Sequence, residues 1–239
     1  MMLSDDLTTC PYCLEQIRRQ ATRCKHCHAE LSEPNPTGSN STSGGSGSFN
    51  IGGSGHHIEG GIHVINTLAD LDGVDEETKR DLREKYESQV RTFPERAQYH
   101  VALGLSYLDR GLYDRASASL ERALEKTSKD ASILYYLALA RIAGRRPRTL
   151  KLAAVQEVER LLTAATLTDR PPAHYKLLLA IVKFDFYTCN GLRVPPPAID
   201  QLLREAALGR IDSQEMKLML QHVPLEGSPI LSAIQAICH

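Results

Sequence analysis

From residue 75 onward, apolar positions recur at the spacing of helices that bury one side. Asp75 suits a helix N-cap, because a short carboxylate there accepts a hydrogen bond from the first turn. Leu82, Tyr86 and Val90 follow at helical spacing, so they share one face of a helix that Pro94 ends. Further apolar stretches predict helices over 172–187, 198–208 and 214–222, and a short one over 230–237 that packs back as a cap.

A pattern of small and large residues repeats along this helical region. The small members let two helices approach and the large ones fill the space between them: Leu103, Gly104, Tyr107, Ala116, Leu120 and Ala123. Leu137 and Ala138 follow Leu103 and Gly104 by 34 residues. In this spacing, residues 76–165 resemble the tetratricopeptide-repeat family. The resemblance implies an α-solenoid of antiparallel helix pairs, and we assign residues 64–239 to it.

The sequence departs from the family pattern at four positions and in one turn. The positions are His100, Leu120, Ser128 and Arg141, and the turn after Gly144 is about four residues too long. In this family the first helix of each pair lines a groove that holds a partner peptide. The resemblance therefore implies that Tyr99 and Tyr136 face such a groove, and that Tyr107 belongs to the core.

A basic run without acidic residues spans positions 141–151. Arg141, Arg145 and Arg146 are its candidate partner contacts. One interpretation is a patch for an acidic peptide or a phosphate backbone. The other is a solvated turn, with cations placed favourably at the C-terminus of a helix.

Near the N-terminus, four cysteines form two C-x-x-C pairs: Cys10, Cys13, Cys24 and Cys27. Each such turn directs two thiolates to a point about 2.3 Å away, and two turns complete the tetrahedron that Zn²⁺ prefers. The alternatives are a redox dithiol, which needs only one pair, and iron. A site closed by four thiolates is structural, because it leaves no position for a substrate.

The residues around these cysteines resemble the short bacterial zinc ribbons of the CPxC…CxHC type. The resemblance covers residues 8–32 and departs at His28, where that family usually has Gly. It implies one structural zinc and an interaction surface without a reaction. We therefore predict a zinc ribbon over residues 1–33.

Residues 34–63 are rich in glycine and serine and connect the two predicted modules. Such a composition buries too little apolar surface to offset the entropy of the chain, so we expect a flexible linker. The alternative is a small β-element, since Ile58 and Ile62 are flanked by glycines as in short strands.

The charge balance, 28 Lys+Arg against 29 Asp+Glu in 239 residues, excludes a globally basic nucleic-acid-coating protein. No apolar stretch approaches the about 20 residues of a membrane helix, and we expect a cytoplasmic protein. No motif of a hydrolase, metalloprotease or nucleotide-binding loop is present. Cys189 has no evident base beside it, so we do not expect an enzyme.

The sequence thus favours a mostly α protein that acts as a non-catalytic adaptor. Its predicted partners are proteins, in the manner of accessory proteins beside signalling or defence effectors. The alternative is nucleic-acid binding through Arg18, Arg19 and Arg23 of the ribbon together with the basic run at 141–151.

Overall fold

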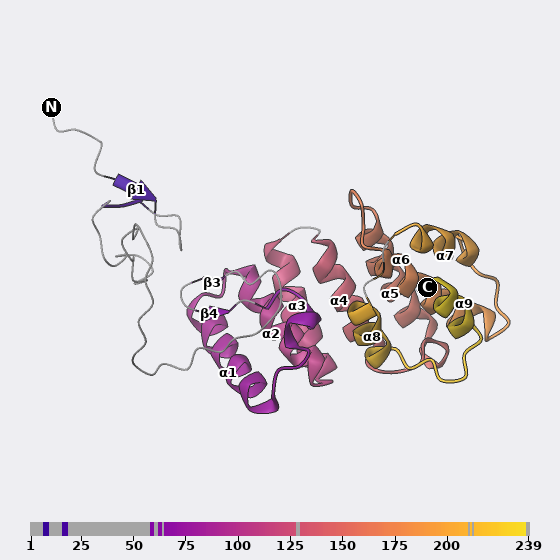
Figure 1. Cartoon of the computed structure of the whole chain (residues 1–239), viewed down its shortest axis with the longest axis horizontal. Coiled ribbons are helices and arrows are strands. Elements are labelled where there is room, and N and C mark those ends of the chain that lie inside the picture. The colour runs from indigo at the N-terminus through magenta and orange to yellow at the C-terminus, as the bar shows by residue number, and fades with distance from the viewer. Residues whose placement is uncertain are drawn as a thin grey trace, which may run out of the picture. The chain divides into compact units, whose positions relative to one another are not determined.

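The structure is a computed structural model of the chain. It describes residues 7–9, 16–18, 58–59, 62–63, 65–127, 130–209, 211 and 213–237. The chain divides into two compact units, Met1–Val64 and Ile65–His239. The second unit is mostly helical in its described part (Figure 1). It begins one residue after the start that we predicted for the helical domain.

The described part of the first unit consists of two short hairpins. β1 (Leu7–Thr9) pairs antiparallel with β2 (Gln16–Arg18), and β3 (Ile58–Glu59) pairs antiparallel with β4 (Ile62–His63). The first hairpin falls in the predicted ribbon, but Cys10, Cys13, Cys24 and Cys27 all lie outside the described residues. The second hairpin falls at the place of the alternative β-element within residues 34–63, and the rest of that segment is also outside the described residues.

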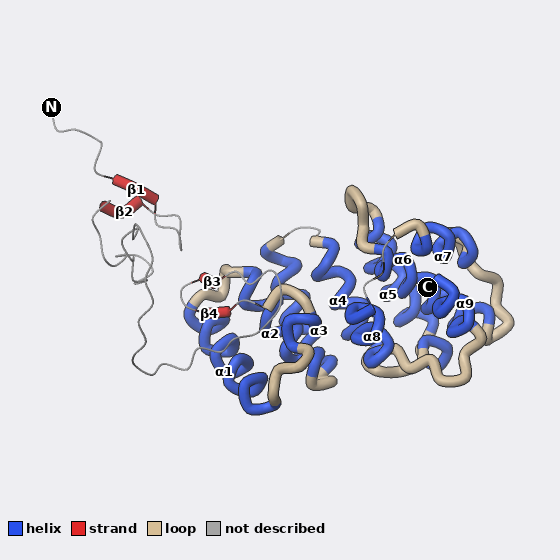
Figure 2. The backbone as a smooth tube through the Cα atoms, viewed as in Figure 1, coloured by secondary structure: helices blue, strands red, loops and turns tan. Residues whose placement is uncertain are grey.

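The second unit is an array of helices linked by loops (Figure 2). In chain order its elements are the 3₁₀ turn η2 (Leu68–Leu71), α1 (Glu76–Thr92), α2 (Ala97–Asp109), α3 (Tyr113–Lys126), α4 (Ala131–Ile142), the 3₁₀ turn η3 (Pro147–Thr149), α5 (Leu152–Thr166), α6 (Ala173–Lys183), the π-helical turn η4 (Phe184–Thr188), α7 (Ile199–Ala207), α8 (Ser213–His222) and α9 (Ile230–Ile237). From α1 to α7, each helix packs on the next one along the chain. This order of contacts is that of an all-α solenoid.

Local signals in the sequence set several helix ends. The Asp75 carboxylate accepts a hydrogen bond from the backbone N–H of Thr78 at 2.9 Å, and this cap begins α1 as predicted. Asp130 caps α4 in the same way through Ser132 N, also at 2.9 Å. Pro94 follows the end of α1, and Gly111 supplies the positive φ of 69° in the turn between α2 and α3.

The pair α2–α3 confirms the predicted use of small residues. Gly104, Ala116 and Leu120 are all buried between the two helices. A Cβ atom on Gly104 would lie 2.7 Å from Leu120 Cγ, closer than real Cβ atoms approach a neighbour. The glycine therefore permits a helix contact that any larger residue would force apart.

The later helices agree with the sequence, with two differences in detail. The long turn after Gly144 contains η3, and the helix expected over 172–187 ends in the π-helical turn η4. α9 packs on α7 and buries Ile230 and Ile234, as predicted for a cap.

Candidate binding surface on the inner face of the helical array

Helices α4 and α6 share a cluster of aromatic side chains. Tyr135 stacks on Tyr175, with ring centroids 4.5 Å apart and 19° between the ring planes. His174 and Tyr136 lie edge-on to Tyr135, at centroid distances of 5.0 and 5.2 Å. Stacked and edge-on rings attract one another beyond the area that they bury. The cluster therefore holds α4 against α6.

Two short segments from opposite ends of the second unit lie over the first helices of the pairs. η2 packs on α2, and α8 packs on α4, on α6 and on η2. η2 contributes the buried Leu68 and Leu71, and α8 contributes the buried Met216 and Met219. We call the surface of α2, α4 and α6 beneath η2 and α8 the inner face.

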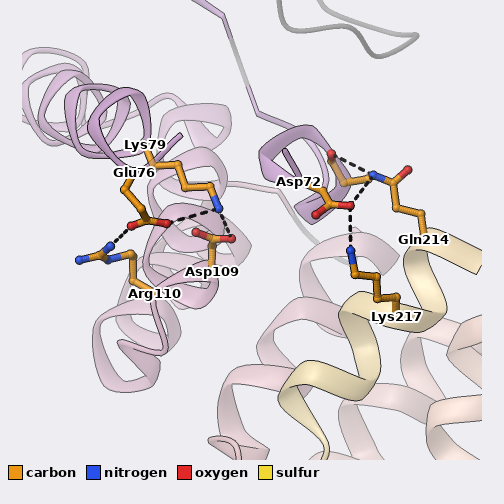
Figure 3. A network of polar contacts seen from close by, with 8 residues as sticks. Asp72, Glu76, Lys79, Asp109, Arg110, Gln214 and Lys217 are labelled. Carbon is orange, nitrogen blue, oxygen red and sulfur yellow. Dashed lines mark hydrogen bonds and ion pairs between the residues drawn. The ribbon is translucent and has the colours of Figure 1, made fainter. Parts of the chain in front are cut away.

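Polar contacts join η2 to α8 (Figure 3). Gln214 Nε2 donates to the carbonyl oxygen of Ala69 at 3.5 Å and to Asp72 Oδ2 at 3.3 Å. Lys217 Nζ lies 3.5 Å from the same carboxylate oxygen. We call these four residues the clasp. Its distances exceed the usual range for hydrogen bonds, so each contact is weak.

The structure corrects the prediction that Tyr99 and Tyr136 face an open groove. Each side chain is only 3% exposed. Tyr136 Oη accepts a hydrogen bond from the backbone N–H of Leu68 in η2 at 3.4 Å. Tyr99 packs its ring on Phe93, at a centroid distance of 6.1 Å. Both tyrosines are therefore inaccessible to a partner while η2 and α8 stay in place.

The hydroxyl groups of the cluster are neutral. Burial raises the pKa of Tyr135 and of Tyr136 well above 10, and the nearby carboxylate of Glu215 on α8 adds to both shifts. Tyr135 Oη is buried and has no hydrogen-bond partner among the residues that the structure describes. A buried hydroxyl without a partner is unfavourable, because it has lost its hydration. Glu215 thus brings a negative charge close to a group that lacks a hydrogen bond.

At the C-terminal end of α8, His222 is buried beside Tyr113. The two rings meet edge-on with centroids 6.0 Å apart, and His222 Nδ1 lies 3.4 Å from Tyr113 Oη. Burial lowers the pKa of His222 below its ordinary value of 6.5, and the carboxylate of Asp109 opposes that shift. The docked position of α8 therefore favours a neutral imidazole.

The basic run at 141–151 divides into paired and exposed cations. Arg141 forms an ion pair with Glu121, and Arg146 Nη2 donates to Asp185 Oδ1 at 2.8 Å. Asp185 is completely buried, and its second oxygen accepts from the backbone N–H of Arg148 at 3.0 Å. Arg146 thus holds the long turn against η4. Arg145, on the same turn, is exposed.

A buried lysine beside this turn escaped the sequence analysis. Lys183 is 2% exposed, and its Nζ donates to the carbonyl oxygens of Pro195 and Pro196 at 2.9 and 3.3 Å. Nζ also lies 3.4 Å from Glu159 Oε1. Lys183 and Asp185 interrupt an otherwise apolar stretch, and that interruption was the available signal for buried charge.

The remaining candidates and the comparisons add little. Cys189 is exposed, at the end of η4. The described ranges contain no group of three or more His, Cys, Asp or Glu side chains that would hold a metal ion. Among the described helices, none combines the length and the apolar character needed to cross a membrane. A comparison with protein-family models, curated proteins and solved structures gave no match.

Proposed function

We propose that this chain is a non-catalytic adaptor. It binds one protein through a four-cysteine zinc ribbon and another through a tetratricopeptide-like helical array. The observation that carries the proposal is that two short segments, η2 and α8, already lie on the inner face of the array. A surface that buries leucine and methionine side chains from short segments of its own chain is suited to a short segment of another protein.

The repeat spacing supports the tetratricopeptide part of the proposal. Glu76 and Arg110 form an ion pair between α1 and the end of α2, and they are 34 residues apart. Lys79 Nζ reaches Asp109 at 3.1 Å beside them (Figure 3). Equivalent positions of neighbouring repeats are thus in direct contact, as expected when repeats stack on one another.

In this proposal Cys10, Cys13, Cys24 and Cys27 hold one structural zinc ion. Zinc content measured on the full chain tests it. We expect one zinc per chain, lost in Cys24→Ser and kept in the matched control Cys189→Ser. The melting temperature of the helical unit stays unchanged, because a metal ligand folds its own small module. Full zinc content in Cys24→Ser would contradict the assignment.

A nuclease-treated pull-down from native cells tests the adaptor function. The baits are the intact chain and the chain without residues 1–33. We expect a defined protein to survive nuclease with the intact chain, and its loss with the shorter bait assigns it to the ribbon. Recovery of nucleic acid alone, abolished by nuclease, would replace the adaptor with the nucleic-acid alternative. In that case binding would also weaken steeply with salt.

A further inference from the structure

We infer that α8 is a displaceable occupant of the inner face, and that the surface beneath it binds an amphipathic helix of a partner protein. The partner helix carries methionine or leucine toward the aromatic cluster and an acidic side chain at the position of Glu215. The inference rests on the proposed function and names the type of partner for the helical array.

The first argument is how loosely α8 is held. Its contacts with α4 and α6 are much less extensive than those between α2 and α3. The clasp contacts measure 3.3–3.5 Å, and the Lys217 side chain remains 60% exposed. Exposed ion pairs contribute little to stability. The docking of α8 therefore depends mainly on its buried apolar side chains.

The second argument is the kind of side chain that α8 buries. Met216 and Met219 are one helical turn apart and are both buried. Methionine is unbranched and polarizable, so it adapts to irregular surfaces, and binding sites that accept several partners use it often. A surface filled by methionine imposes little shape specificity, and another helix with flexible apolar residues fits it equally well.

The third argument is the hydroxyl group of Tyr135. It is buried at the centre of the aromatic cluster, and within the described part of the chain it has no hydrogen-bond partner. A partner helix whose carboxylate accepts this hydrogen bond gains an interaction that α8 does not make. Because a hydrogen bond to a charged acceptor is stronger than one to a neutral group, the chemistry favours an acidic side chain.

Hydrogen exchange of the full-length protein tests whether α8 opens by itself. In Met219→Ala we expect the amides of α8 to exchange at least tenfold faster, while those of α2 and α3 keep their rate. The matched control Leu120→Ala truncates a buried side chain of the α2–α3 pair, so it accelerates exchange throughout the second unit. If the amides of α8, α2 and α3 accelerate together in Met219→Ala, α8 is an integral part of the array and the inference is wrong.

A second variant keeps the test decisive if Met219→Ala does not fold. Lys217→Glu places a negative charge against Asp72 at the exposed edge of α8 and touches no buried side chain. We expect its α8 amides to exchange about twofold to fivefold faster, the range set by an exposed ion pair. An unchanged rate would show that the clasp does not hold α8.

The binding surface is tested in trans with a labelled synthetic peptide of residues 211–225. We expect it to bind the full-length Met219→Ala or Lys217→Glu protein at least tenfold more tightly than the wild type, whose own α8 competes. A peptide with Glu215→Gln binds the opened protein more weakly. Equal or absent binding to the opened and wild-type proteins would overturn the inference. If the peptide binds but the pull-down recovers no protein, the surface is correct and the adaptor function is wrong.

Discussion

The pair α2–α3 and the docking of α8 are two different ways to bury a helix in the same unit. In α2–α3 the main chains approach so closely that Gly104 has no room for a Cβ atom against Leu120. α8 instead reaches the inner face through methionine side chains and weak polar contacts. The difference teaches that close packing of small residues fixes the array, whereas flexible side chains hold its cover.

The largest expected effect breaks the better-packed of the two contacts. Leu120 is completely buried against Gly104, so Leu120→Ala leaves a cavity between α2 and α3. We expect the free energy of unfolding to fall by about 2–5 kcal/mol, measured by urea denaturation of the full chain. An unfolding free energy within about 0.5 kcal/mol of the wild type would show that the pair does not carry the stability of the unit.

A smaller effect is expected when a methyl group is added to the same contact. Gly104→Ala places a Cβ atom 2.7 Å from Leu120 Cγ, and such overpacking costs about 1–3 kcal/mol. The gain in helix propensity offsets about 1 kcal/mol of this cost. We expect a net loss of about 1 kcal/mol in the same denaturation experiment. A more stable Gly104→Ala variant would mean that the two helices separate without penalty.

The helical array was largely readable from the sequence because its signals are local. The cap at Asp75, the stop at Pro94 and the close approach at Gly104 each depend on residues near one another in the chain. The small and large residues also repeat every 34 positions, which fixes how neighbouring pairs stack. Local signals and repetition thus predicted the array and the site of its tightest contact.

The cover of the inner face was not readable, because its contacts join distant parts of the chain. Gln214 and Ala69 are 145 residues apart, and no pattern in either segment points to the other. Tyr136 lies on a helix that is apolar on nearly every side, and such helices are buried all round. That property, visible in the sequence, contradicted an open groove. The pairing of Arg146 with the buried Asp185 was hidden for the same reason of distance.

Acidification sharpens the comparison by acting on α8 alone. Because burial lowers the pKa of His222, the undocked helix binds a proton more readily than the docked one. The stability of docking is complete above pH 6.5 and is lost as the pH falls below that value. We expect α8 amides, corrected for intrinsic exchange, to exchange faster by up to about tenfold per pH unit below 6.5.

The control for this prediction is His222→Gln, which keeps a polar side chain but does not titrate. In that variant the exchange of α8 relative to α2 and α3 no longer depends on pH between 7.5 and 5.5. If wild type and variant respond equally to acid, another group controls the docking of α8, and the buried His222 is only a packing residue.

The smallest effect is expected at the ion pairs between α1 and α2. Arg110 and Glu76 are both well exposed, so Arg110→Ala changes the free energy of unfolding by less than about 0.5 kcal/mol. Lys79 and Asp109 are mostly buried and lie 3.1 Å apart, so Lys79→Ala is the more damaging of the two substitutions. Urea denaturation of both variants decides the order. A larger loss in Arg110→Ala would mean that the exposed pair, with its spacing of 34 residues, stabilises the stacking of neighbouring repeats more than burial does.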